Sequence, residues 1–165
     1  SRVSRGLGDV YKRQVLLAGL SGCLSSEEEL EAFPSFSLAD HETTTHNNSM
    51  YAGTPYVAYF SASWCSHCTP TLDAVLDAVP ADHLLIFNFE SNEDWSDMNA
   101  WKDKMESELE RTIDHPFIHA PPLATTLGVD GLPTVFFVNS DGLIEERTKG
   151  LQTPDTVQEH WSSLS

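Results

Sequence analysis

The sequence predicts one α/β domain in which a mixed β-sheet lies between helices. Continuous apolar runs at residues 56–60 and 84–89 are typical of strands that are buried on both faces. Between these runs the apolar residues recur at helical spacing, and residues 134–149 have the pattern of a β-hairpin. A mixed sheet accommodates both a strand-helix-strand unit and a hairpin.

Length and composition agree with a single globular domain. The chain has 165 residues, of which 40% are hydrophobic, so the low hydrophobicity of a disordered chain is absent. The 25 Asp and Glu residues outnumber 9 Lys and Arg residues, and the formal net charge is -16. Such a surface repels phosphate backbones, which excludes nucleic-acid binding. We interpret the acidity as a solubility or salt adaptation, with an acidic docking face for a basic partner as the alternative.

The first 32 residues predict a targeting signal and a tether rather than part of the folded domain. Residues 1–14 are Gly- and Arg-rich without an apolar period, and we expect them to be a non-native leader. Residues 15–23 form an apolar run that is too short to span a bilayer, as in the end of a signal peptide. This run ends in Leu20-Ser21-Gly22-Cys23, which resembles a lipobox and predicts a lipid on Cys23. The alternatives are a plain cleaved signal or an ordinary buried cysteine.

A lipid on Cys23 would define both the anchor and the compartment. Residues 24–32 would then be an acidic tether, and the domain itself would span residues 33–165. One lipidated cysteine would hold this domain at the outer face of a membrane without spanning it. An extracytoplasmic compartment permits disulfides.

The domain opens with a short strand and a polar loop. Residues 33–40 alternate apolar with small or polar residues, and Pro34 suits an edge strand. We expect residues 41–49 to form a loop.

A strand, a helix and a second strand follow. Residues 56–60 form the first buried strand, which we expect to be central. The helix after Cys65 should end at Pro80, and residues 84–89 form the next buried strand. The apolar positions of this helix lie three or four residues apart: Leu72, Val75, Leu76 and Val79.

The second half of the domain adds a helix, a hairpin and a last helix, with a short helix before the hairpin. Residues 94–111 are rich in helix formers and carry an apolar stripe that we interpret as core packing. The hairpin pairs residues 134–139 with residues 143–149, and Thr153 caps a final helix that begins at Pro154. The stripe consists of Trp95, Met98, Trp101, Met105 and Leu109.

The chemistry is predicted at Cys65 and Cys68. They form a C-x-x-C pair that directly follows a buried strand and opens a helix. The first sulfur then lies among the unpaired N–H groups of the helix terminus, which favour a thiolate. Cys65 should therefore attack a partner disulfide, and Cys68 should resolve the resulting mixed disulfide.

These motifs resemble the thioredoxin superfamily, and more closely its TlpA/ResA-like membrane-anchored thiol-disulfide oxidoreductases. The matching segments are Phe36-Ser37-Leu38-Ala39-Asp40, the stretch from Tyr59 to Cys68, and Gly131-Leu132-Pro133-Thr134 with the strand after it. The resemblance implies a thioredoxin-like fold whose central mixed sheet is flanked by helices, with an N-terminal strand extension. It also implies exchange of disulfides with extracytoplasmic proteins.

The resemblance assigns further residues. The Leu132-Pro133 bond would be cis, leaving the Leu132 backbone free to pair with a substrate strand; a trans proline at the start of a strand is the alternative. Trp64 would shape the docking surface, unless it is a core aromatic. The redox-active Cys65–Cys68 disulfide would be the only redox group, with no metal and no cofactor. Partners would be protein thiols or disulfides and an upstream redox donor or acceptor.

The sequence departs from the family pattern at three places. Thioredoxin has a buried Asp six residues before the first cysteine, and here that position is Tyr59, so Glu90 is a candidate proton acceptor. Pro70 should kink the active-site helix. Ser66 and His67 separate the cysteines, and a protonated His67 would stabilise the thiolate and make the disulfide a better oxidant. The direction of electron flow stays open.

Two other functions compete with disulfide exchange. Cys65 and Cys68 together with His115 and His119 offer four ligands to zinc or copper in a thioredoxin-fold chaperone. A binding module without redox activity is the second alternative. The remaining histidines lie in polar or helix-end contexts, and we expect them on the surface: His41, His46, His83 and His160.

Overall fold

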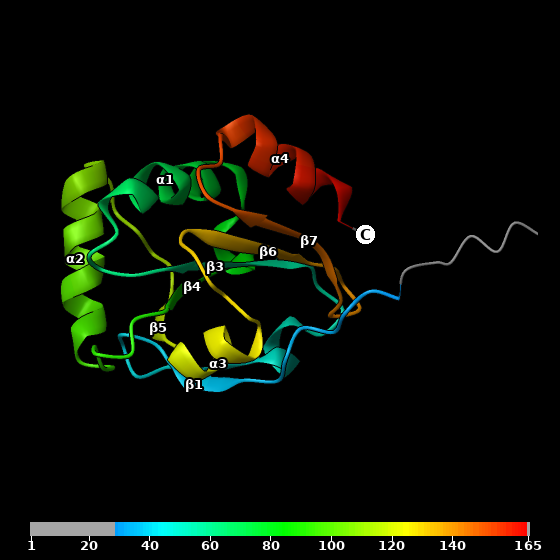
Figure 1. The fold of residues 1–165 in the computed structure, drawn as a ribbon, viewed down its shortest axis with the longest axis horizontal. Coiled ribbons are helices and arrows are strands. Elements are labelled where there is room, and N and C mark those ends of the chain that lie inside the picture. Colours follow the sequence, from blue (N-terminus) through cyan, green and yellow to red (C-terminus); the bar gives the residue numbers. More distant parts are fainter. Residues whose placement is uncertain (1–28, 165) are drawn as a thin grey trace, which may run out of the picture.

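A computed structural model describes residues 29–164, which form a sheet covered by helices on both faces (Figure 1). The sheet has the strand order β5-β4-β3-β6-β7, so the first buried run lies at its centre as expected. The strands β3, β4 and β5 run parallel, whereas β6 is antiparallel to β3 and β7 is antiparallel to β6. Their bounds are β3 (Tyr56–Ser61), β4 (Leu84–Asn88), β5 (Phe117–His119), β6 (Thr134–Val138) and β7 (Ile144–Lys149).

The helices complete two layers around this sheet. Figure 1 shows α1 and α4 side by side on one face, α3 on the other face, and α2 next to β5. The helix bounds are α1 (Thr69–Ala78), α2 (Asp97–Leu109), α3 (Pro121–Thr126) and α4 (Pro154–Ser163). Three short 3-10 helices join these elements: η1 (Asn48–Tyr51), η2 (Ser66–Cys68) and η3 (Ala81–His83).

The central strand β3 is buried on both faces because its side chains alternate between two cores. Val57 and Tyr59 belong to the core beneath α1, α2 and α4. Ala58 and Phe60 belong to the core beneath α3, where Phe33 and Phe36 also pack. The continuous apolar run in the sequence follows directly from this double burial.

The N-terminal part differs from its prediction in two places. A small antiparallel pair is formed by β1 (Ser37–Ala39) and β2 (Thr45–Asn47), so the loop predicted for residues 41–49 contains a strand. The backbone N–H of Ile144 donates to the Glu31 carbonyl at 2.8 Å, and Ala32 pairs with Leu143 in an isolated antiparallel β-bridge. The last residues of the predicted tether therefore already contact the domain. The leader, the signal remnant and Cys23 lie outside the described residues.

The loop of residues 40–46, here called the Asp40 loop, turns back because of one buried carboxylate. Asp40 Oδ1 accepts hydrogen bonds from the backbone N–H groups of Glu42 and Thr44, both at 2.9 Å, and Oδ2 lies 2.8 Å from His46 Nε2. Burial by itself would raise the pKa of Asp40, but these hydrogen bonds outweigh it and lower the pKa. The carboxylate satisfies the backbone donors that this reversal leaves without strand partners.

Most of the apolar stripe predicted to pack in the core is confirmed by the buried face of α2. Met98, Trp101 and Met105 are buried, and the Trp101 ring packs edge-on against Phe117. Trp95 is the exception, because it is 40% exposed and donates its indole N–H to the Asp40 carbonyl. Among residues 29–164 there is no helix whose length and apolar character would suit a membrane span.

Pro70, which was predicted to kink the active-site helix, lies at the start of α1 instead of inside it. A 3-10 turn, η2, precedes α1, and Pro70 lies in the first turn of α1. A first-turn residue has no helical carbonyl to which it could donate, so the missing proline N–H costs no hydrogen bond there.

Candidate active site

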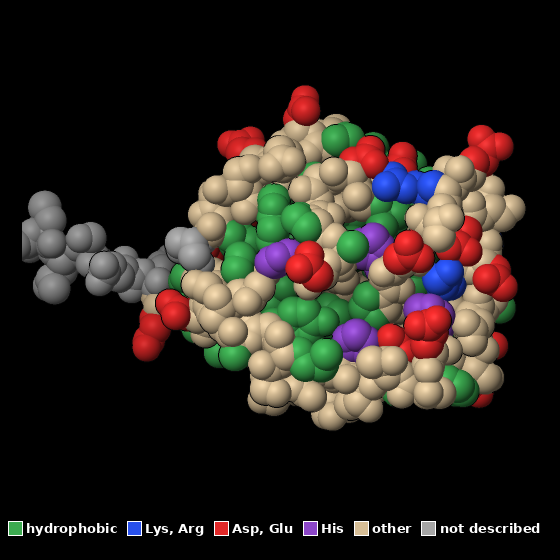
Figure 2. Space-filling view, turned by 180° about the vertical axis from the view of Figure 1, so that it is seen from behind, with side chains coloured by type: hydrophobic (Ala, Val, Ile, Leu, Met, Phe, Trp, Pro, Cys, Tyr) green, Lys and Arg blue, Asp and Glu red, His purple; other side chains and the backbone are tan. Residues whose placement is uncertain are grey.

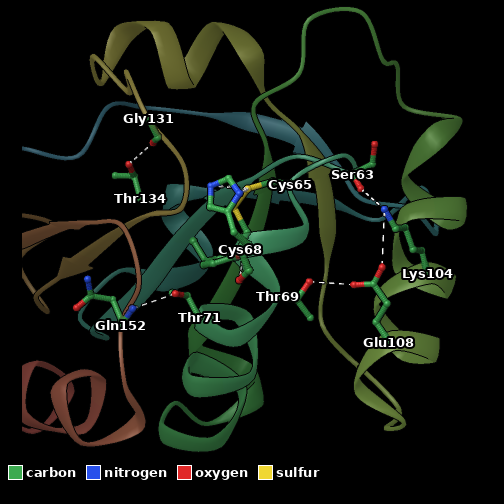
Figure 3. Close-up of a disulfide and its surroundings, with 12 residues drawn as sticks. Ser63, Cys65, Cys68, Thr69, Thr71, Lys104, Glu108, Gly131, Thr134 and Gln152 are labelled. Carbon is green, nitrogen blue, oxygen red and sulfur yellow. Dashed lines mark hydrogen bonds and ion pairs between the residues drawn. A yellow bond between two sulfur atoms is a disulfide. The ribbon is translucent and has the colours of Figure 1, made fainter.

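Cys65 and Cys68 form a disulfide at the end of the central strand, as the spacing predicts (Figure 3). After β3 ends at Ser61, the Cys65 N–H donates to the Ala62 carbonyl at 3.1 Å, and the Cys68 N–H donates to the Cys65 carbonyl at 3.0 Å. These bonds place Cys65 immediately before η2, so its sulfur belongs to the start of a helical run. A helix terminus stabilises negative charge on a sulfur.

The two cysteines face different surroundings. The residues next to Cys65 reach the surface: Trp64 is 55% exposed, and Ser66 and His67 are exposed as well. Both cysteines are themselves buried, Cys65 at 3% and Cys68 at 1% exposed, but Cys68 continues into the buried side of α1. A partner sulfur can therefore approach the bridge from the side of Cys65.

His67 lies against the outer sulfur. Its Nε2 and Nδ1 atoms are 3.4 and 3.6 Å from Cys65 Sγ. A protonated imidazole at this distance would stabilise a Cys65 thiolate by charge and by hydrogen bonding. The tuning role expected for His67 thus has the required geometry.

Tyr59, the residue six positions before the first cysteine, contacts the inner cysteine of the disulfide. Its hydroxyl donates to the Cys68 carbonyl at 3.1 Å, and burial raises its pKa above the ordinary range for tyrosine. Tyr59 therefore stays neutral, and it holds the backbone of the inner cysteine rather than accepting a proton.

Glu90, the candidate proton acceptor, is engaged elsewhere. Its carboxylate accepts hydrogen bonds from the backbone and side-chain amides of Asn92 at 2.8 and 2.9 Å, and from Trp64 Nε1 at 2.8 Å. These hydrogen bonds lower the pKa of Glu90, and the bond from the Asn92 backbone has the largest effect. The contacts indicate that Glu90 orients the exposed indole of Trp64.

Further acidic and basic side chains hold the start of the active-site segment, defined here as residues 63–69. The Ser63 hydroxyl donates to Glu93, and the other oxygen of Glu93 accepts from Asn88 Nδ2 at 2.7 Å. From α2, Lys104 Nζ donates to the Ser63 carbonyl at 2.5 Å. Ser63 is thus fixed from two elements that lie far from it in the sequence.

The end of the active-site segment is held by the same helix. Thr69 Oγ1 donates to Glu108 Oε2 at 2.9 Å, and Lys104 lies 3.8 Å from Glu108 Oε1 (Figure 3). Sequence reasoning missed Glu93, Lys104 and Glu108. Their charges look like a solvated helix face, and no local signal connects them with the cysteines.

The segment before β6 forms the other wall of the site. Thr134 pairs with Phe60 in the antiparallel register, so the preceding residues lie at the end of β3. The Leu132-Pro133 peptide bond is cis, and the Pro133 carbonyl accepts from the Gly150 N–H at 2.8 Å. Within residues 29–164 the Leu132 backbone makes no hydrogen bond, so it is free to pair with an incoming strand.

The four-ligand metal site considered from the sequence is not assembled. Within the described part of the chain, one group of at least three potential ligands has its donor atoms within 4.8 Å of one another: Cys65, His67 and Cys68. His119 Nε2 lies 3.1 Å from the Glu90 carbonyl instead, and His115 lines a cavity of about 460 Å³ beside the Asp40 loop.

The surface prediction for the remaining histidines is wrong for His41. His41 is 8% exposed, and its Nδ1 accepts the backbone N–H of Phe117 at 3.3 Å. His46, His83 and His160, also expected on the surface, are half-buried, and His46 contacts Asp40. His41 and His46 hold the Asp40 loop, His41 through a partner distant in the sequence and His46 through Asp40 itself.

Comparison with known proteins agrees with this geometry. Residues 46–162 match the family model of the thioredoxin-like domain. No curated protein matches the chain.

Solved structures share the fold at low sequence identity. The pneumococcal exposed lipoprotein thioredoxin Etrx1 of Streptococcus pneumoniae is 23% identical with a TM-score of 0.62, over 79% of this chain and 100% of that chain. StoA of Bacillus subtilis is 20% identical with a TM-score of 0.58, over 79% and 98%. A secreted Mycobacterium tuberculosis disulfide oxidoreductase homologous to Escherichia coli DsbE is 14% identical with a TM-score of 0.60, over 78% and 96%.

Proposed function

Because this chain belongs to the thioredoxin-like family, we propose that it is a thiol-disulfide oxidoreductase that exchanges disulfides with other proteins through Cys65 and Cys68. The observation that carries the proposal is the position of this disulfide. It lies at the start of a helix, next to the exposed residues Trp64, Ser66 and His67, with the unpaired Leu132 backbone in the adjacent segment.

The reaction follows from the different surroundings of the two sulfurs. A partner thiolate attacks Cys65 Sγ, which breaks the bond to Cys68 and leaves Cys68 as a thiolate. Cys68 then takes up a proton, and a second partner thiol attacks the mixed disulfide. The partner loses two electrons and becomes a disulfide, whereas the Cys65–Cys68 pair gains two electrons and two protons. The same steps in reverse reduce a partner disulfide.

Docking of the partner would use the exposed indole of Trp64 and the free backbone of Leu132. Trp64 presents a large apolar surface that Glu90 holds in place. A short strand of the partner can add to Leu132 by backbone hydrogen bonds, which are independent of the side-chain sequence. This arrangement suits an enzyme with many protein substrates.

The extracytoplasmic location and the anchor are part of the proposal. The pneumococcal relative is described as an exposed lipoprotein and the mycobacterial one as secreted. A lipid on Cys23 would place this domain in the same kind of compartment. Mass spectrometry of the mature N-terminus of the membrane-associated protein tests this, and an unlipidated Cys23 would contradict it.

A trapping experiment tests the exchange mechanism. Cys68→Ala should accumulate a mixed disulfide with a disulfide-bonded peptide, because the Cys65 thiolate attacks the peptide disulfide, the second peptide sulfur leaves as a thiolate, and the sulfur that would resolve the adduct is gone. Cys65→Ala is the matched control and should accumulate none. Adducts that form through Cys68 alone would contradict the assigned roles.

A further inference from the structure

In residues 29–164 we find one close group of potential metal ligands, and it includes both cysteines of the redox pair. Its third member, His67, is not required for disulfide exchange. Cys65, His67 and Cys68 bring two sulfurs and one imidazole within 4.8 Å of one another. In the oxidised state shown here the sulfurs are bonded at 1.99 Å and cannot hold an ion. Reduction turns them into two thiols that face the same imidazole.

The distances match the requirements of a metal ion. With metal–sulfur and metal–nitrogen bonds of about 2.3 and 2.05 Å, tetrahedral geometry places a sulfur and a nitrogen ligand about 3.6 Å apart. The two ring nitrogens of His67 lie 3.4 and 3.6 Å from Cys65 Sγ, so this edge of the tetrahedron already exists. The two sulfurs would have to separate to about 3.8 Å, a distance that two unbonded thiolates adopt without clash.

The surroundings favour a cation. The chain carries a formal net charge of -16, and Figure 2 shows more acidic than basic side chains on one face, around a largely hydrophobic centre. Glu90 and Glu93 border the active-site segment.

From this geometry we infer that the reduced protein binds one thiophilic metal ion, Zn²⁺ or Cu⁺, through Cys65 Sγ, Cys68 Sγ and the His67 imidazole. Two thiolates and one imidazole are the donors that these ions prefer. Binding displaces the two thiol protons and transfers no electron to or from the metal. After the ion dissociates and the two thiols regain their protons, a partner disulfide can re-oxidise the pair: the partner takes up the two electrons and two protons and becomes a dithiol, and the Cys65–Cys68 disulfide that forms no longer binds the ion.

The site makes metal and disulfide exchange mutually exclusive states of one centre. A bound ion occupies the sulfur that must attack, so it should block exchange by the reduced protein. It should also stabilise the reduced form: above the dissociation constant, each tenfold increase in free metal raises the midpoint potential by about 30 mV.

The experiment is a titration of the full chain, reduced and desalted without oxygen, with Zn²⁺ and separately with Cu⁺ against a coloured chelator. We expect one equivalent of at least one ion to bind the reduced protein and none to bind the oxidised protein. His67→Gln should weaken binding at least tenfold, as should Cys65→Ser and Cys68→Ser. The matched controls His115→Gln and His119→Gln remove the other imidazoles and should bind as the wild type does.

The outcomes separate this inference from the proposed exchange activity. A Co²⁺ spectrum of the reduced protein should show tetrahedral sulfur coordination that changes in His67→Gln, because one nitrogen donor is lost. Equal affinity and equal spectra for wild type and His67→Gln would overturn the three-ligand site. Chemical reduction prepares the site, so metal binding can be measured even if no exchange is detected, and exchange can be measured in metal-free buffer if no metal binds.

Discussion

The Asp40 loop and the active-site segment are both short irregular stretches fixed by acidic side chains, yet they direct those side chains differently. In the Asp40 loop a buried carboxylate accepts backbone N–H groups inside its own loop, and His46 covers it. In the active-site segment Glu93, Lys104 and Glu108 hold only Ser63 and Thr69 at the ends.

Between these ends, Glu90 accepts the Trp64 indole N–H, Tyr59 donates to the Cys68 carbonyl, and His67 contacts Cys65, but no side chain from elsewhere in the described residues covers Ser66 or His67 by a hydrogen bond. The difference shows how one small fold separates stability from reactivity. The polar groups of the Asp40 loop are satisfied by the Asp40 carboxylate and by residues of the packed domain such as Trp95 and Phe117, which stabilises the folded state. The active-site segment is fixed at its ends and leaves the sulfurs accessible to a partner.

The sharpest test of this division is the removal of the outer sulfur. Cys65→Ala should abolish disulfide exchange, because the sulfur that forms the mixed disulfide is gone. Its free energy of unfolding should stay within about 1 kcal/mol of the reduced wild type, since a thiol makes few stabilising contacts. Exchange assays and urea unfolding, both against reduced wild type, measure the two quantities. A large loss of stability would show that the active-site segment also supports the fold.

The converse change is Asp40→Asn. It replaces a charged acceptor by a neutral amide and should lower the free energy of unfolding by about 1–3 kcal/mol at neutral pH, with exchange unchanged. Asp82→Asn is the matched control, because the Asp82 side chain is 84% exposed. Equal stability of the two variants would contradict a structural role for the buried carboxylate.

The same carboxylate predicts a pH dependence. The pKa of Asp40 is lowered in the folded protein, so its stabilisation is present above the ordinary aspartate pKa. It is lost as the pH falls through the lowered value. Below about pH 4 the wild type should therefore lose stability more steeply than Asp40→Asn in urea unfolding, and parallel curves would rule out this linkage.

A smaller effect is expected at the docking surface. Trp64→Ala should raise the KM for a protein substrate by about fivefold to tenfold, in line with the loss of an exposed aromatic contact. Glu90→Ala should show part of this effect, because the indole loses the acceptor that orients it. Met50→Ala removes an equally exposed apolar side chain from η1 and serves as the control. A change in kcat alone would argue against docking.

The smallest effect is expected from the charge on His67. His67→Pro should make the metal-free couple more reducing by up to about 20 mV, which corresponds to an exposed charge interaction of about 1 kcal/mol. Titration of wild type and variant with glutathione buffers measures the two potentials. An unchanged potential would mean that His67 does not tune the couple.

Local pattern alone was enough for the central part of the fold and for the two reacting residues. The runs at residues 56–60 and 84–89 identify buried strands because both faces of β3 and β4 meet a core. The spacing of Cys65 and Cys68 after such a strand identifies the redox pair because strand, turn and helix start are neighbours in the chain. Thr153 and Pro154 mark the start of α4 for the same reason.

The strands β2 and β5 were missed, since each has three residues and depends on partners elsewhere. β2 forms only where the Asp40 carboxylate reverses the chain, and β5 pairs with β4 beside the buried His41. A three-residue stretch has too little periodicity of its own to be recognised as a strand.

The amino-acid sequence by itself determined which residues react, because a C-x-x-C pair at a helix start is a local arrangement. Only the tertiary structure decided how they are held and tuned. Glu93, Lys104 and Glu108 reach Ser63 and Thr69 across 30 to 41 residues, and Glu90 reaches Trp64 across 26. The physical reason is that side-chain hydrogen bonds act over about 3 Å in space, and only the packing of α2 and of the residues after β4 beside the active-site segment brings these groups that close.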